Sequence, residues 1–319
     1  MTDRLAFFTT NQIPAKYNNH LRRITLAYET YGILNAARDN AILIIHGFSA
    51  SSHAASHNSQ DVAGWWEWAV GPGKPLDTDK YFVVCSNNFG SCFGSTGPVN
   101  PPPAIADIVF CQRKLQEALG IVQWQAVIGG SLGGMAVLEW VTAYPENMRR
   151  AVCLNAGAKL SFIGQGLMDI QQELIRALPD KGLNLARRLA DLSYVGEEFF
   201  IAHKQENPNW RLNNFLTEES AMFVDQFNGD SYMSFLQAMC SYDLTLGDSP
   251  LCRCMSKPEV LLIGCREDIL FPVWIIEETK SRLSAFTAIN QEIVHSQYGH
   301  DAFLLDEILY SKILRKIFS

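Results

Sequence analysis

Long apolar runs, a net positive charge and low-complexity tracts are all missing from this sequence of 319 residues. No run approaches the roughly 18 consecutive apolar residues that suggest a membrane-spanning helix. The formal net charge of −7 argues against nucleic acid as a partner, because a polyanion is attracted by a basic surface. Residues 1–5 do not begin a basic segment followed by an apolar one, as a secretory signal would. We therefore expect a cytoplasmic protein that binds neither membranes nor nucleic acid.

A metal site is not indicated by the spacing of the cysteines and histidines. Cys252 and Cys254 form one close pair, but a structural zinc site needs a second such pair. In a cytoplasmic chain of this size the cysteines are expected to stay reduced. His46, His53 and His57 are close in sequence, but their spacing fits no usual ligand motif. The sequence therefore predicts no bound metal.

The sequence does contain an alternation of apolar strand-like and helix-like segments, and its 48% hydrophobic content is typical of a well-packed globular protein. Strands are predicted over 22–30, 41–45, 81–85, 126–128, 151–154, 260–264 and 291–294, with an amphipathic helix over 104–119. A single C-terminal helix is predicted after residues 298–301, and it carries Phe303, Leu304, Ile308, Leu309, Ile313 and Ile317. Such an alternation builds a mostly parallel central sheet with helices on both faces. Residues 158–247 show only helical segments. We predict a core domain of residues 1–157 and 248–319, and an inserted helical cap of residues 158–247.

A candidate nucleophile stands at the centre of this pattern. Residues 129–133 read Gly-Gly-Ser-Leu-Gly, directly after the apolar run 126–128 and directly before a helix-like segment. A G-x-S-x-G pattern in this context predicts a sharp strand-to-helix turn that presents the serine hydroxyl above the sheet. The N-terminus of the following helix offers N–H groups and a positive dipole end to an oxyanion. Ser131 is the residue that this turn would expose.

Two further polar residues follow later predicted strands. Asp268 comes after the strand at 260–264, and His300 after the strand at 291–294. The carboxyl ends of parallel strands share one crevice, so these residues can meet Ser131 there. Their chain order is that of the catalytic triad in the α/β-hydrolase fold. In that chemistry His300 takes the Ser131 proton, while Asp268 fixes the imidazole tautomer and offsets its positive charge.

An oxyanion hole is predicted from two backbone N–H groups. One belongs to Leu132, the residue after the candidate nucleophile, and the other to Phe48, in the glycine-containing loop after the strand at 41–45. Together they would hold the negative charge of a tetrahedral intermediate. The pattern as a whole predicts an acyl-transfer or ester-cleaving enzyme with an α/β-hydrolase fold.

Short motifs spread along the chain narrow this prediction. They are YETYG at 28–32, GWW at 64–66, GPGK at 71–74, DTDKYF at 77–82, GSTGP at 94–98, GGSLGGM at 129–135 and GHDAFL at 299–304. These motifs resemble those of the homoserine O-acyltransferases of methionine biosynthesis, and the resemblance runs from about residue 20 to the C-terminus. Most of them are not shared by α/β-hydrolases at large.

The resemblance implies that a serine carries an acyl group from acyl-CoA, as co-substrate, to the hydroxyl of homoserine, without a permanently bound cofactor. It also implies that Arg187 and Tyr194 in the cap, with Asp301 after the histidine, hold the amino acid. An arginine suits an α-carboxylate because its planar fork donates two hydrogen bonds, and an aspartate suits the ammonium group. The family commonly forms dimers through the cap, which allows a homodimer here as well.

Three departures from the family pattern leave alternatives open. The loop between residues 98 and 107 is shorter, the cap segment 164–181 is cut down, and residues 46–48 read His-Gly-Phe instead of His-Ala-Leu. We expect an acetyl group to be moved from acetyl-CoA to L-homoserine by a ping-pong mechanism. A homoserine O-succinyltransferase and a small-ester hydrolase are the alternatives, because the same triad uses water wherever the cap fails to exclude it. A non-catalytic binding protein is a third interpretation, which the intact triad disfavours.

Overall fold

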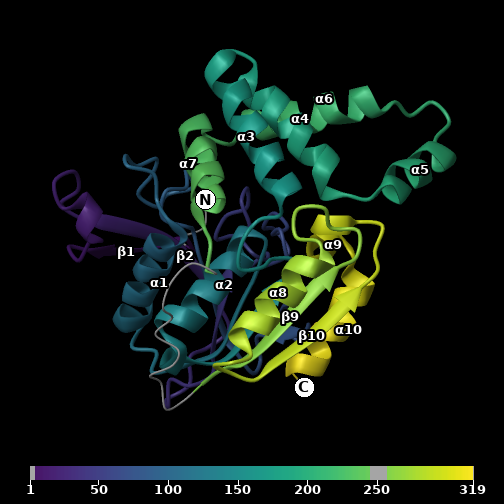
Figure 1. Cartoon of the computed structure of the whole chain (residues 1–319). Coiled ribbons are helices and arrows are strands. Elements are labelled where there is room, and N and C mark those ends of the chain that lie inside the picture. The colour runs from purple at the N-terminus through teal and green to yellow at the C-terminus, as the bar shows by residue number, and fades with distance from the viewer. Residues whose placement is uncertain (1–3, 245–256, 319) are drawn as a thin grey trace.

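The computed structural model describes residues 4–244 and 257–318, and within them a twisted sheet forms the centre of the molecule (Figure 1). Its strands lie in the order β1-β2-β6-β3-β7-β8-β9-β10. Their bounds are Ala6–Thr10 (β1), Ile24–Tyr31 (β2), Ala41–Ile45 (β3), Phe82–Ser86 (β6), Trp124–Gly130 (β7), Met148–Leu154 (β8), Glu259–Cys265 (β9) and Ile289–Val294 (β10). Only β1–β2 and β2–β6 pair antiparallel. The sheet is therefore mostly parallel, as predicted, and the chain has the α/β-hydrolase architecture.

Helices cover both faces of this sheet. All five residues of β3 are therefore buried. Leu43 and Ile45 face the layer of α1 (Ile105–Leu119), α2 (Leu132–Ala143) and α8 (Val273–Leu283). Ile42 and Ile44 face the opposite layer, which holds α10 (Glu307–Phe318) and the segment with the short strands β4 (Val70–Gly71) and β5 (Leu76–Asp77). Successive side chains of a strand point to opposite faces, so a strand covered on both sides is apolar throughout.

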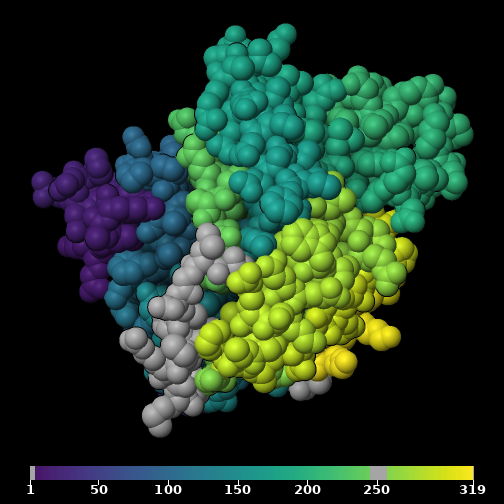
Figure 2. Space-filling model, in the orientation of Figure 1, coloured from purple at the N-terminus to yellow at the C-terminus, as the bar shows by residue number. Residues whose placement is uncertain are grey.

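Helices also fill the segment between β8 and β9. They are α3 (Phe162–Ala177), α4 (Gly182–Tyr194), α5 (Glu197–Glu206), α6 (Leu212–Val224) and α7 (Gly229–Ser241). Figure 1 shows α3 to α6 at the end of the sheet that carries α9 (Ala302–Leu305), and Figure 2 shows their side chains above the C-terminal segment. The predicted boundary at 247–248 and the pair Cys252 and Cys254 lie outside the described residues. The division into two domains stays a prediction.

Three elements differ from the sequence prediction. The edge strand β1 has no fully buried residue, so its five positions carry only a weak apolar signal. Helix α8 was not predicted. The single helix predicted after His300 is broken at Asp306, whose backbone leaves the helical region and whose Oδ1 accepts a hydrogen bond from the Leu309 N–H at 3.2 Å. Asp306 thus begins α10 as a cap.

None of the helices in the described ranges combines the length and the apolar character that a membrane crossing requires. This agrees with the absence of a long apolar run in the sequence.

The close packing of α2 on β3 can be tested by substituting a glycine at the contact. A Cβ at Gly133 would overlap the backbone oxygen of Ile45, and neither backbone can move without disturbing the sheet. We expect Gly133→Ala to lower the free energy of unfolding by about 3 kcal/mol. Gly166, in the middle of α3, has open space where its Cβ would lie. Gly166→Ala should therefore raise stability by about 0.5–1 kcal/mol. Urea denaturation measures both, and equal stability of the two variants would contradict this packing.

Candidate active site

Ser131 stands at the turn between β7 and α2 with φ 57° and ψ −125°, a backbone conformation that a non-glycine residue rarely adopts. The turn is held at both sides, since the Ser131 N–H donates to Leu154 O at 3.1 Å and the Ser131 carbonyl accepts from the Met135 N–H at 3.0 Å. The side chain therefore leaves the sheet at its carboxyl edge. This is the geometry expected of a nucleophile elbow.

His300 and Asp268 lie beside this serine, in line. The Nε2 atom of His300 is 2.8 Å from Ser131 Oγ, and its Nδ1 atom is 2.7 Å from Asp268 Oδ2. The other carboxylate oxygen, Oδ1, accepts hydrogen bonds from the N–H groups of Leu270 and Phe271 at 2.8 and 2.9 Å. The carboxylate is thus fixed by backbone donors and presents one oxygen to the ring. Three residues far apart in the sequence meet in the order that proton transfer from serine needs.

The charge on this histidine is set by its surroundings. Burial lowers the pKa of His300, but the adjacent Asp268 carboxylate, by its charge and its hydrogen bond, and the charge of Asp301 outweigh burial, so the pKa is raised above the usual 6.5. The ring of Phe271 stacks on the imidazole with centroids 5.7 Å apart. These surroundings therefore favour the protonated form of His300.

Asn155 positions the loop that carries His300, and sequence reasoning missed it. Its Nδ2 donates to the carbonyls of Gly299 and His300 at 3.1 and 2.8 Å, while its Oδ1 accepts from the Tyr310 hydroxyl at 2.8 Å. Asn155 also has a positive φ of 44°. It directly follows β8, and its place at the carboxyl end of a buried strand is the signal that could have identified it.

A cavity of about 240 Å³ opens over Ser131 and His300. Its wall also includes Phe48, Arg187, Tyr194 and Asp301, among other residues. A larger hollow of about 390 Å³ lies along β9, β10 and α10, and none of the described residues that line it is a serine, cysteine or histidine. The triad residues Ser131 and His300 line the smaller cavity, and we take this as the candidate active site.

The two residues proposed for the oxyanion hole flank the nucleophile. Leu132 is the first residue of α2, and its side chain is buried in the core. Phe48 follows β3, and its ring packs edge-on against Tyr232 and Phe235 of the cap at centroid distances of 4.7 and 5.8 Å. Phe48 thereby joins the core to the cap at the cavity wall. The use of its N–H as an oxyanion donor stays a prediction.

The residues expected to hold an amino acid bring both signs of charge to the cavity. Arg187 Nε lies 2.8 Å from Asp191 Oδ1, and its guanidinium group lies 4.4 Å from the ring centre of Phe223. Burial raises the pKa of Asp301 to about 6, against the opposing charges of His300 and Arg187. At neutral pH Asp301 is therefore mostly a carboxylate, close to a fixed cation.

Asp191 was not predicted from the sequence. It lies four residues after Arg187 on α4, a spacing that places two side chains on the same face of a helix. Burial raises the pKa of Asp191 to about 6, although the charge of Arg187 opposes the rise. The pair orients the guanidinium and leaves its Nη1 only 3.4 Å from Ser49 Oγ at the cavity.

Comparison with known proteins agrees with this geometry. Residues 40–307 match the α/β hydrolase fold family. A homoserine O-acetyltransferase of Methanobrevibacter ruminantium is 34% identical, over 94% of this chain and 70% of the relative. A homoserine O-succinyltransferase of Herminiimonas arsenicoxydans is 32% identical, over 99% of this chain and 93% of the relative. The chain belongs to the homoserine O-acyltransferase family.

A solved member of the homoserine O-acyltransferase family shares the whole architecture. The crystal structure of homoserine O-acetyltransferase from Bacillus anthracis superimposes with a TM-score of 0.85 at 25% identity, covering 100% of this chain and 98% of that chain. The expected fold and the expected family are thus both confirmed. Among the relatives named above, both acetyl and succinyl donors occur, so family membership by itself does not select the acyl group.

The hydrogen bond between Ser131 and His300 predicts how the serine reacts. His300 accepts the proton only when neutral, so labelling of Ser131 by a serine-directed phosphonate should slow as the pH falls, with a midpoint above 6.5. In Asp268→Asn the charge that raises this pKa is gone, so the midpoint should move down and the rate should fall about 10⁴-fold. Mass spectrometry of the Ser131 peptide measures both quantities. Asp180→Asn, an exposed change, is the control. Labelling that does not depend on pH would contradict the proposed role of His300.

Proposed function

We propose that the chain transfers an acetyl group from acetyl-CoA to the hydroxyl of L-homoserine, as in methionine biosynthesis, through an acyl-enzyme on Ser131. The observation that carries this proposal is the cavity wall, which holds a cation at Arg187 and an anion at Asp301 around the Ser131–His300 hydrogen bond. A hydrolase of simple esters has no need for this pair of charges. An α-amino acid has a carboxylate and an ammonium group that match it.

In the first half of the reaction, Ser131 Oγ attacks the thioester carbonyl while His300 Nε2 takes its proton. The N–H groups of Leu132 and Phe48 hold the oxyanion of the tetrahedral intermediate. Collapse of this intermediate breaks the carbon–sulfur bond, and CoA leaves as the thiol after taking the proton from His300. Ser131 now carries the acetyl ester.

In the second half, homoserine takes the place of CoA. The carboxylate of homoserine pairs with Arg187, and its ammonium group pairs with Asp301. Tyr194 completes the cavity wall, and the centre of its ring lies 5.8 Å from the centre of the His300 ring. His300 removes the proton of the homoserine hydroxyl, which attacks the acetyl ester. The tetrahedral intermediate then collapses, the bond between the acetyl carbon and Ser131 Oγ breaks, and His300 returns its proton to Oγ. O-acetylhomoserine leaves, and Ser131 is a free hydroxyl again. The mechanism is ping-pong because each substrate uses the same serine in turn.

An acetyl donor fits the cavity better than a succinyl donor. Within the described residues, Arg187 is the only lysine or arginine in the cavity wall, and it pairs with Asp191 and, in this proposal, with the homoserine carboxylate. The second carboxylate of a succinyl group would therefore be buried without a cation of its own, which is costly. We also retain as predictions a cytoplasmic location and a homodimer formed through the cap.

Product analysis tests this proposal directly. With acetyl-CoA and L-homoserine, the enzyme should form O-acetylhomoserine in step with free CoA. With succinyl-CoA, kcat/KM should be lower by about tenfold or more, because a buried carboxylate is left unpaired. Mass spectrometry of the products and a thiol assay for CoA give both results. Free acetate without O-acetylhomoserine would show an esterase or thioesterase and contradict the transferase proposal. Equal use of succinyl-CoA would contradict the donor assignment alone.

Arg187→Lys separates binding of the amino acid from acylation of the serine. Lysine keeps the charge but loses the planar fork, so KM for homoserine should rise by about 10- to 100-fold. The burst of CoA released from acetyl-CoA alone should be unchanged, because that step does not use the fork. Arg188→Lys is the matched control, since Arg188 contacts Asn213 on the cap. An unchanged KM in Arg187→Lys would remove this residue from the substrate site.

A further inference from the structure

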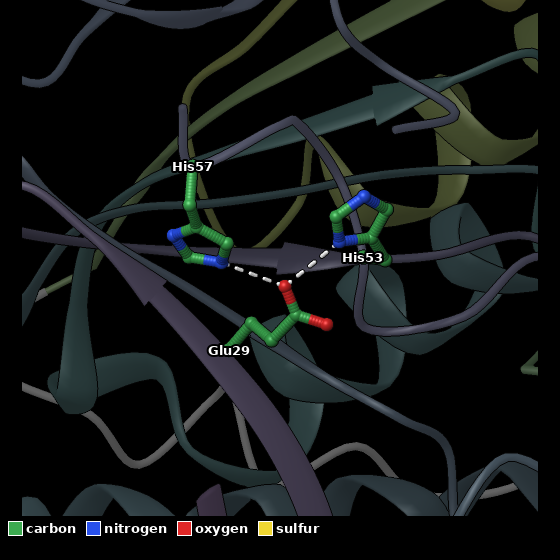
Figure 3. Close-up of side chains that lie close together, drawn as sticks. All are labelled: Glu29, His53 and His57. Carbon is green, nitrogen blue, oxygen red and sulfur yellow. Dashed lines mark hydrogen bonds and ion pairs between the residues drawn. The ribbon is translucent and has the colours of Figure 1, made fainter. Parts of the chain in front are cut away.

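Three potential metal ligands converge at a place that the triad does not use. Glu29 Oε2, on β2, lies 2.9 Å from His53 Nδ1 and 2.8 Å from His57 Nε2 (Figure 3). One ligand atom of each residue falls within 4.8 Å of the others. The side chains of Glu29, His53 and His57 are 8%, 22% and 13% exposed, so bulk water has little access. Both histidines come from the loop between β3 and β4, which packs here against β2.

We propose that Glu29, His53 and His57 form a site for a divalent zinc ion that fastens this loop to the sheet. Two imidazole nitrogens and one carboxylate oxygen are a ligand set that Zn²⁺ prefers, with water in the fourth position of a tetrahedron. This departs from our expectation of no metal. The spacing of the histidines gave no ligand motif because the third ligand comes from a strand that precedes them in the chain.

His46, the third histidine of this region, is not part of the site. Its Nε2 accepts a hydrogen bond from the Asn88 N–H at 3.0 Å, and burial lowers the pKa of His46 to about 4. It is therefore a neutral ring that orders the loop after β6.

The orientation of His53 favours a cation between it and Glu29. Its Nε2 lies 2.9 Å from the carbonyl oxygen of Val62, which can only accept, so Nε2 carries a proton. Burial lowers the pKa of His53, but its hydrogen bonds to the Val62 carbonyl and to Glu29, and the charge of Glu29, outweigh burial, so the pKa is raised. Zinc would take the place of the proton that Nδ1 otherwise shares with the carboxylate. A ring N–H bound to a backbone carbonyl is also the usual way in which a metal-binding histidine is oriented.

His57 and Glu29 are held in place by a shared neighbour, Tyr31. Its ring stacks on His57 with centroids 4.5 Å apart at 11°. Its hydroxyl donates to Glu29 Oε2 at 3.2 Å and accepts from the N–H groups of Ala54 and Ala55. Zinc bonds of about 2.0–2.1 Å would place tetrahedral ligand atoms roughly 3.3 Å apart. The two distances from Glu29 Oε2 to the histidine nitrogens, 2.9 and 2.8 Å, would therefore lengthen by a few tenths of an ångström on binding.

The zinc would act on the active site through Trp65. The Trp65 indole N–H donates to Ser51 O at 2.9 Å, its backbone N–H donates to His53 O at 3.3 Å, and its side chain lines the cavity over Ser131. The loop that holds two ligands thus also supplies part of the cavity wall. A metal here has a structural role, and its binding does not depend on the proposed acyl transfer.

The test is zinc binding by the full chain after removal of metals with a chelator. Calorimetry should show one equivalent of Zn²⁺ bound, with a melting temperature that rises with zinc concentration. His53→Gln and His57→Gln should each weaken binding by about tenfold or more. His20→Gln, which changes an exposed histidine that is not one of the three ligands, is the matched control and should bind zinc as the unaltered chain does. Binding that is equal in all four proteins would overturn the proposal.

A second measurement needs no variant and so does not depend on whether the substitutions fold. X-ray absorption at the zinc edge should show nitrogen and oxygen neighbours, with two imidazole rings and no sulfur. A sulfur neighbour would place the metal on the cysteines and contradict this site. The absence of zinc binding in the unaltered chain would show that the three residues are a hydrogen-bonded carboxylate with a protonated histidine.

Discussion

The 2.8 Å hydrogen bond between Ser131 Oγ and His300 Nε2 is the contact on which the rest of the site depends. It exists because β7 and β10 end at the same edge of the sheet, as parallel strands do, and because Ser131 adopts a φ of 57° that turns its side chain out of the core. That strained turn is tolerated only where α2 packs closely on β3, and Gly133 provides the space. On the other side, Asn155 fixes the histidine loop.

In our proposal, the charged residues around the Ser131–His300 hydrogen bond determine which acceptor takes the acyl group. A triad in an open cleft passes its acyl group to water, whereas the cap places Arg187 over the triad and orients it with Asp191. Asp301 adds the opposite charge, and burial raises its pKa to about 6. In our proposal, these groups bind the carboxylate and the ammonium group of a zwitterion. In our account, this binding makes an amino-acid hydroxyl, and not water, the acceptor.

Much of this could be predicted from the sequence because it follows from local rules. Buried strands are apolar, and the residues that directly follow parallel strands lie at one edge of the sheet. This rule predicted that Ser131, Asp268 and His300 lie close together. Edge strand β1 was missed because none of its residues is fully buried. Asn155 was missed because its place directly after β8 indicates a position near the crevice but does not reveal that its side chain binds the distant loop of His300. The Glu29 cluster was missed for the same reason: packing of a loop on β2 creates it, and no spacing records that contact.

The central claim is that one serine passes an acetyl group to an amino acid in preference to water. Rapid-quench mixing with labelled acetyl-CoA, followed by digestion, should place the label on the peptide that contains Ser131. A chase with homoserine should then remove the label faster than buffer alone and deliver it to O-acetylhomoserine. Loss of the label as free acetate, at a rate that homoserine does not change, would contradict the account.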